Sequence, residues 1–220
     1  MTADGNSGDG NSGAVLLTEL ERDALTEVIN IGVSRAAKNL SRMVKEQVHL
    51  SVPRTDIMSR DQAVGWLSKR ENSSLVAVGQ NFRGSFSGQA LLIFPEKTSL
   101  ELVRGILDGT LSLEEIVDLE QEALAEIGNI VLNGCLVVMA NMLKRGLNMS
   151  LPRVLRGSGG LVMLGRNDND PDEMVMFLTI DFAVRSRNID GYIALLMDLP
   201  SLATVRDLIR DYISGFENPS

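Results

Sequence analysis

The feature that most constrains the fold is an internal repeat. Moved along the chain by 99 positions, residues 23–54 align without a gap with residues 122–153, and ten of the 32 positions are identical. Residues 88–95 resemble residues 191–200 in the same way. The pattern predicts a single domain at 14–220 made of two similar halves, at about 14–110 and 111–220, related by a pseudo-two-fold axis. We expect a monomer, because the second half supplies the contact that a dimer partner would make.

Each half has the same order of expected elements: a long helix, a strand, a hairpin, a proline and a short helix. Thr18 with Glu21, and Ser112 with Glu115, have the spacing of a capping box at the start of each long helix. The periodicity predicts helices at 17–45, 96–107, 113–144 and 202–214, and strands at 48–52, 75–81, 89–94, 161–164, 174–184 and 192–197. This order predicts an α+β fold, in which an antiparallel sheet built from both halves packs against the two long helices.

Composition restricts the environment and the partners. Residues 1–13 are mostly Gly, Asn, Ser and Asp, which predicts a disordered tail. The net charge of −8 argues against a nucleic-acid partner, because phosphate-backbone binding needs an excess of cations. The apolar run near 130–143 is interrupted by Asn133 and Asn141 and falls short of the roughly 20 residues of a membrane span. We therefore expect a cytoplasmic protein without membrane insertion.

The rarest side chains exclude several kinds of site. One cysteine, Cys135, rules out an internal disulfide and a cysteine-based zinc site. A Ser-His-Asp triad would have to use His49, the one histidine, which sits in an alternating apolar and polar stretch and is expected to be a strand residue rather than a base. No metal-binding cluster is expected.

The polar residues that the repeat retains are the candidates for chemistry. They form an acid-and-amide stripe on each long helix, with members three and four residues apart on one face: Asp23, Glu27 and Asn30, and Glu122, Glu126 and Asn129. One interpretation is the solvated face of an amphipathic helix. The second helix favours a site, because it is apolar nearly all round from 130 to 143, and unpartnered polar groups buried there would cost about 1–3 kcal/mol each.

An acid with an amide, without histidine, cysteine or a metal cage, suits two tasks. The carboxylate can pair with a cation on a partner, and the amide can orient a water molecule for in-line attack, as a glutamine does in GTPases. The carboxylates could instead hold Mg²⁺, but Asp23 and Glu27 offer too few convergent oxygens for a dedicated site.

The spacing resembles the signature of the CheC/CheX/FliY family of chemotaxis phosphatases. An acidic residue is followed after three residues by Glu, after two more by Asn and after 22 more by Pro, and this occurs twice. The two prolines are Pro53 and Pro152. The resemblance runs from about residue 16 to the last residue, and two copies resemble CheC rather than CheX.

The resemblance implies a phosphatase for a phosphorylated response regulator, a CheY-like receiver carrying an aspartyl phosphate. Glu27 and Glu126 would pair with the receiver's lysine, and Asn30 and Asn129 would align the attacking water. Mg²⁺ would be supplied by the response regulator, so no intrinsic cofactor is expected. The prolines are expected to shape the turn after the helix rather than take part in chemistry.

Two departures from the family pattern distinguish the sites. Position 122 is Glu where the family has Asp or Ser, and Ile29 stands where the second copy has Gly128. Bulk beside Asn30 is expected to alter helix packing or the receiver's approach, so the second site is favoured.

The alternative function is a non-catalytic binding module for a response regulator, for flagellar switch proteins or for CheD, a receptor deamidase with which CheC proteins pair. The retained Glu and Asn pairs favour the phosphatase, because a scaffold does not need them. An enzyme of another class has no support, since the sequence contains no P-loop and no dinucleotide-binding fingerprint.

Overall fold

The structure is a computed structural model that describes residues 17–45, 47–71, 73–106, 112–163, 174–184 and 187–217. The tail expected at 1–13 lies outside these residues. The described elements, in chain order, are α1 (Glu19–Val44), β1 (Val48–Ser59), α2 (Arg60–Arg70), β2 (Leu75–Gly84), β3 (Gly88–Pro95), α3 (Glu96–Ile106), α4 (Leu113–Met142), β4 (Leu147–Met149), β5 (Arg153–Gly157), α5 (Gly159–Val162), β6 (Met174–Val184), β7 (Arg187–Met197) and α6 (Leu199–Glu217).

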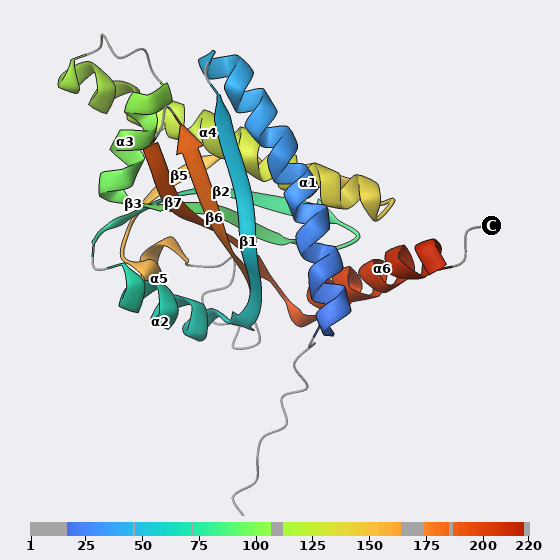
Figure 1. Cartoon of the computed structure of the whole chain (residues 1–220). Helices are drawn as coiled ribbons and strands as arrows, with labels where there is room; N and C mark the ends of the chain where they lie inside the picture. Colours follow the sequence, from blue (N-terminus) through green and yellow to red (C-terminus); the bar gives the residue numbers. More distant parts are fainter. Residues whose placement is uncertain are drawn as a thin grey trace, which may run out of the picture.

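A seven-stranded antiparallel sheet forms the centre of the molecule, as expected for the α+β class. Its strand order is β1-β6-β7-β3-β2-β4, and β5 also pairs with β2. Strands from the two halves are interleaved in this order: β6 and β7, from the second half, lie between β1 and β3, from the first half. Figure 1 shows α1 and α4 crossing on one side of the sheet, and α2 and α5 lying together away from that crossing.

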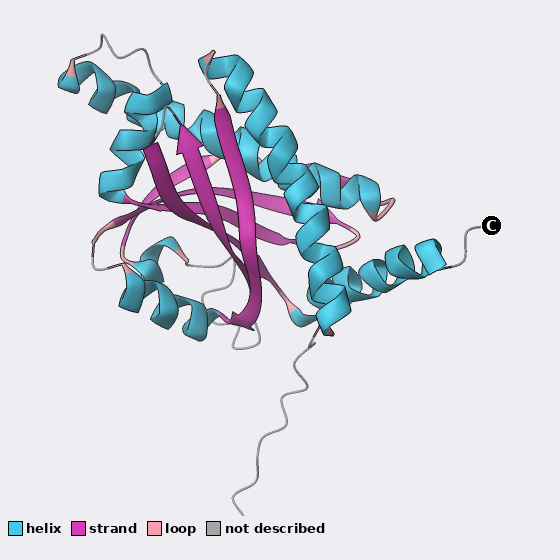
Figure 2. Cartoon of the chain, in the orientation of Figure 1, coloured by secondary structure: helices cyan, strands magenta, loops and turns pink. Residues whose placement is uncertain are grey.

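The two faces of the sheet bury different cores, because side chains alternate along each strand. On β2, Val76 and Val78 join the cluster that includes α1 and α4, whereas Leu75 and Ala77 join the cluster that includes α2 and α5. Figure 2 shows the helical layers around the magenta sheet. The sheet is therefore buried on both faces, and α1 and α4 share one of them.

Both capping boxes form as the sequence predicts, and they fix where the two long helices begin. The side chains of Thr18 and Ser112 each accept a hydrogen bond from the backbone N–H three residues on, and the carboxylates of Glu21 and Glu115 accept one from the backbone N–H of the cap residue. Each long helix is also followed by a lysine in the left-handed region, Lys45 and Lys144, both with φ 53°. These two lysines are 99 positions apart, as in the sequence repeat, while the duplication itself stays a prediction.

Several expected elements are wrong or incomplete. Residues 161–164 were expected to form a strand, but Gly159–Val162 is the short helix α5, capped by Ser158. Helix α2 was not expected, and neither were β4 and β5. The strand expected at 48–52 extends to Ser59.

The expectation that the apolar run is too short to cross a membrane is also wrong by length. Within α4, the 24-residue segment Leu119–Met142 has a mean hydropathy of 1.8, enough for a span by length and composition. However, 56% of its most apolar window is buried inside the protein. A single helix of this kind is weak evidence for a membrane span, because a core helix has the same composition.

Glu21 connects the start of α1 to α6. Its buried carboxylate accepts hydrogen bonds from the Thr18 backbone N–H and from the Arg210 guanidinium. Burial raises the pKa of this carboxyl, but the Thr18 and Arg210 hydrogen bonds outweigh burial, so the pKa lies below its ordinary value. The charged form of Glu21 therefore stabilises the folded state.

Glu21→Gln keeps the capping box but removes the charge. At neutral pH we expect the variant to be less stable by about 1 kcal/mol, because Arg210 is half exposed. The folded pKa is the lower one, so the difference persists above the ordinary carboxyl pKa of about 4.3 and shrinks as the pH falls below it. Urea unfolding of both proteins at pH 7, 5 and 3.5 measures this, and a constant difference would contradict it.

Candidate functional site

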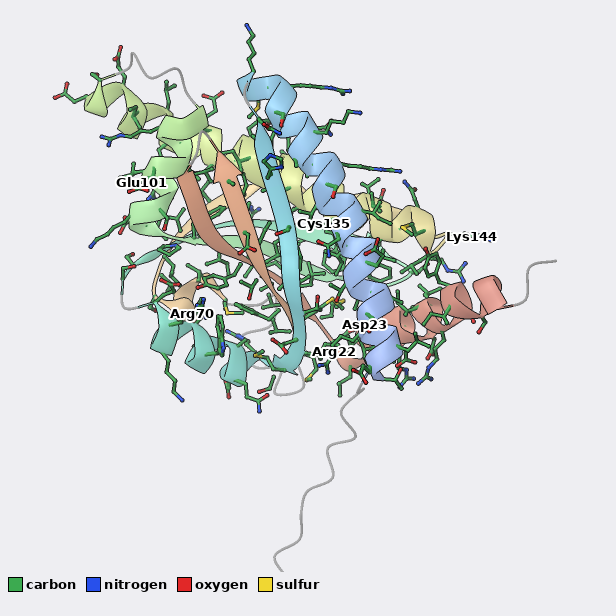
Figure 3. All side chains as sticks on the ribbon, viewed as in Figure 1. Arg22, Asp23, Arg70, Glu101, Cys135 and Lys144 are labelled. Atoms are coloured by element: carbon green, nitrogen blue, oxygen red, sulfur yellow. The ribbon has the colours of Figure 1, made fainter. Side chains whose placement is uncertain are left out.

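The two acid-and-amide stripes lie where the helical spacing places them. On α1, Asp23 and Glu27 are exposed and Asn30 is half-buried. Figure 3 labels Asp23 on the first half of this helix. On α4, Glu122 and Glu126 are exposed and Asn129 is half-buried. In each stripe the carboxylates therefore face solvent, while the amide lies at the border between solvent and core.

Asn30 is bound to the backbone of β1 at both ends of its amide. Its Nδ2 donates to the Val52 carbonyl at 3.2 Å, and its Oδ1 accepts from the Val52 N–H at 2.9 Å. Val52 lies in the interval between Ser51 and Arg54 in which the register of β1 with β6 shifts. The Asn30 amide thus satisfies two backbone groups that a regular ladder would otherwise pair.

Asn129 has different partners. Its Oδ1 accepts from Gln80 Nε2 at 3.0 Å and from Asn133 Nδ2 at 2.7 Å. A carbonyl oxygen has two lone pairs, so both acceptor positions are filled. No hydrogen bond of Asn129 Nδ2 is found among the described residues, which leaves its two N–H donors for a partner molecule. The two amides, equivalent in sequence, therefore differ in what they can offer.

Gly128 explains how α4 comes close enough to the sheet for this network. A Cβ at position 128 would lie 2.4 Å from Cγ1 of Val78, a residue of β2 two positions from Gln80. At the equivalent position of α1, Ile29 is 1% exposed and belongs to the core. That Ile29 alters helix packing stays a prediction. Its side chain does not reach the surface, so it cannot obstruct an approaching receiver directly.

The surface beside the second stripe is hollowed. A groove of about 500 Å³ is lined by Gln121, Glu122, Ala125, Pro152, Arg153 and Val154. The neighbouring Leu151 is 85% exposed, whereas Val52, its equivalent in the repeat, is 2% exposed. Exposed apolar side chains beside a groove are typical of docking surfaces. The second stripe therefore has a groove and an apolar side chain next to it.

The two prolines occupy different settings. Pro152 was expected in the turn after the helix, but β4 intervenes, and Pro152 lies in the loop between β4 and β5, where it lines the groove. Pro53 was expected in a turn, but it lies within β1, in the interval of the register shift; its side chain is outside the described part of the structure. Proline has no N–H to donate to a strand ladder. It is tolerated at this position because the regular pairing of β1 with β6 is interrupted there.

Sequence reasoning missed Gln80 and the role of Asn133. Asn133 follows Asn129 by four residues on the same helix, so helical spacing could have identified the pair. Gln80 lies on β2, 49 positions from Asn129, and only the tertiary fold brings the two together.

The structure also locates the groups considered for metal or nucleophile chemistry. Within the described ranges, no three His, Cys, Asp or Glu side chains are grouped closely enough to hold a metal ion. His49 is an exposed residue of β1, as its alternating neighbours predict. Cys135 is buried, and burial raises the pKa of its thiol to about 12. A thiol with this pKa is not a nucleophile at neutral pH.

The fold of this chain is shared with proteins of known structure. The chain superposes on FliY of Thermotoga maritima with a TM-score of 0.68 and 17% identity, covering 90% of this chain and 99% of that one. It superposes on the FliM middle domain of H. pylori with a TM-score of 0.59 and 9% identity, covering 87% of this chain and 99% of the other. At these identities the similarity shows the fold alone.

Two curated proteins are similar to this chain in sequence. CheC1 of Halobacterium salinarum is 22% identical over 183 residues, which are 82% of this chain and 92% of that protein. The CheY-P phosphatase CheC of Bacillus subtilis is 23% identical over 150 residues, 67% of this chain and 71% of the relative. No family model matches the chain. Together, the relatives and the fold support the CheC/CheX/FliY family, which the motif spacing predicts.

Proposed function

We propose that this protein is a phosphatase that accelerates the loss of phosphate from the aspartyl phosphate of a CheY-like response regulator. The name of the Bacillus subtilis relative, a CheY-P phosphatase, supports the substrate class. The observation that carries the proposal is the state of Asn129, a half-buried residue beside two exposed carboxylates. The carbonyl oxygen of its side-chain amide already accepts two hydrogen bonds, and its N–H donors have no partner among the described residues.

The roles follow from what each group can do. Glu126 in the second site, and Glu27 in the first, would pair with the receiver's lysine through exposed carboxylates. Asn129, and to a lesser extent Asn30, would enter the receiver's active site. One Asn129 N–H would donate to the attacking water oxygen and the other to a phosphoryl oxygen, so that a remaining lone pair of the water points at phosphorus.

The reaction needs no nucleophile from this chain. As the bond from the water oxygen to phosphorus forms, the bond from phosphorus to the receiver's aspartate oxygen breaks, which yields inorganic phosphate and a free carboxylate. The water proton leaves to the phosphate or to solvent. The Mg²⁺ would come with the receiver, and this protein would lower the barrier by positioning and by hydrogen bonds to the developing charge.

The second candidate is a binding module without catalysis, for a response regulator, for flagellar switch proteins or for CheD. The similarity to the FliM middle domain favours it, because that likeness extends over 87% of this chain. The occupied Asn30 amide is also compatible with a structural rather than a catalytic first site. In either case we propose a monomer in the cytoplasm.

The proposal is tested by following loss of phosphate from a phosphorylated CheY-type receiver with Mg²⁺, with and without this protein. The double variant Asn30→Ala with Asn129→Ala is expected to show no acceleration. The matched control is Asn39→Ala with Asn141→Ala, which makes the same change at exposed positions of the same two helices and should keep the activity. If no receiver from the same cell loses phosphate faster despite measurable binding, the binding module is the function.

A further inference from the structure

We infer that Gln80 is the positioning residue of the second site, which determines that Asn129 presents its N–H donors rather than its carbonyl oxygen to the partner. This inference deepens the proposed function and rests on it for its catalytic consequence. Its structural content, the orientation of one amide, stands independently. Gln80 is 1% exposed, so it cannot touch a docked receiver and can act only through other residues.

Gln80 connects three parts of the site through one amide nitrogen. Its Nε2 donates to Asn129 Oδ1 on α4 at 3.0 Å and to the Ser150 carbonyl at 3.1 Å. Ser150 begins the loop that carries Leu151 and Pro152, and it is fixed to β2 by two hydrogen bonds with Asn81. Gln80, a residue of the sheet, therefore holds Asn129 and the loop that begins at Ser150 in fixed positions relative to each other.

The orientation of the Gln80 amide follows from its two acceptors. Reversing it would bring its carbonyl oxygen against the oxygens of Asn129 and Ser150, with no proton in either contact. In the observed orientation Gln80 Oε1 is buried without a hydrogen-bond partner among the described residues. A buried acceptor without a partner is unfavourable, so this orientation is kept because the two Nε2 hydrogen bonds outweigh the loss at Oε1.

The consequence for Asn129 is chemical. Because Gln80 and Asn133 fill both lone pairs of its Oδ1, Asn129 can only donate, and its Nδ2 is directed away from these two donors. Within the part of the chain that the structure describes, the first site has no comparable side-chain contact to the Asn30 amide, since both ends of this amide bond to the Val52 backbone. Gln80 thus distinguishes the second site from the first.

Two substitutions at Gln80 test the inference in the full-length protein. In Gln80→Glu, assayed at a pH above the pKa of the buried carboxyl, the ionised carboxylate cannot donate to Asn129 Oδ1 and would attract its N–H groups, which reverses the amide. In Gln80→Met the volume is kept and both hydrogen bonds are lost. For both variants we expect kcat for dephosphorylation of the receiver to fall about 10- to 100-fold, with KM changed less than about twofold, because positioning is lost and docking is kept.

The matched control is Gln62→Glu, which makes the same change in the capping box of α2, where Glu serves as well as Gln. It should leave both constants unchanged. An unchanged kcat in folded Gln80→Met, or an effect on KM alone, would overturn the inference.

A second readout does not depend on activity. The side-chain ¹⁵N amide signals of Asn129, assigned by their loss in Asn129→Ala, should be a single sharp pair in the wild type and broadened or shifted in Gln80→Met. Unchanged signals would overturn the positioning role even if the protein is a phosphatase. Changed signals in a protein without phosphatase activity would keep the positioning role and reject the proposed function.

Discussion

Asn129→Ala is expected to lower the acceleration of receiver dephosphorylation about 100-fold or more, while the variant stays folded. The alanine removes the N–H donors that would hold the water and the phosphoryl group, and removing one donor of this kind typically costs two to three orders of magnitude in rate. Single-turnover loss of phosphate from the receiver, at saturating protein, measures the effect on the chemical step.

Asn30→Ala is the informative comparison, because the two asparagines are equivalent in the repeat. It should keep most of the activity but lower the free energy of unfolding by about 1–3 kcal/mol, since two Val52 backbone groups lose their partners. Equal losses of activity in the two single variants would show instead that both sites are catalytic and that the Val52 contact opens on docking.

Gly32→Ala is expected to destabilise the protein by about 3 kcal/mol, because α1 and α4 touch backbone to backbone at this position. A Cβ there would lie 2.6 Å from the Gly134 carbonyl oxygen and 2.8 Å from Cys135 Cα. Neither atom belongs to a flexible side chain, so the two helices would have to separate. Urea unfolding of the variant and the wild type measures the difference.

Gly65→Ala is the matched control, a glycine in the helix α2 whose added Cβ would meet nothing within 4 Å. It should stabilise the protein by about 0.5–1 kcal/mol, because alanine loses less backbone entropy than glycine in a helix. If Gly32→Ala is as stable as the wild type, the close crossing of α1 and α4 is not a feature of the protein in solution.

The fold could be predicted from the sequence where local signals were strong. The capping boxes at Thr18 and Ser112 indicated the starts of the long helices to within a residue or two, and the short apolar runs of β2, β3 and β6 indicated strands. These elements also carry the apolar periodicity by which both layers of the α+β fold are recognised.

The missed elements have weak local signals. Helix α2 places only Ala63 and Leu67 in the core, and polar residues make up much of the rest, so its apolar face is too narrow to detect. Strand β5 is short and has no fully buried side chain. Its pairing with β2 stabilises it, and the paired residues are 74 to 82 positions apart in the chain. Its pairing partner is not visible in a local window.

For the candidate site, the sequence predicted which residues share a helix face, and the structure places them there. It could not predict that Asn30 would bind the Val52 backbone while Asn129 would meet Gln80. Those partners depend on an irregularity in β1 and on how closely Gly128 lets α4 approach β2. Differences between repeated halves arise from such tertiary contacts, and a repeat comparison reports only what the halves share.

Trp66, the chain's one tryptophan, gives the protein a fluorescent reporter on the far side of the sheet from both stripes. Its ring packs edge-on against Phe177 and Tyr192, with centroids 5.0 and 5.5 Å away, and the Arg70 guanidinium lies over it. Unfolding would expose this ring and shift its emission, whereas a receiver docked on α1 or α4 would leave its surroundings unchanged. Intrinsic emission can therefore report the integrity of every variant during a phosphatase assay, without a label near the site.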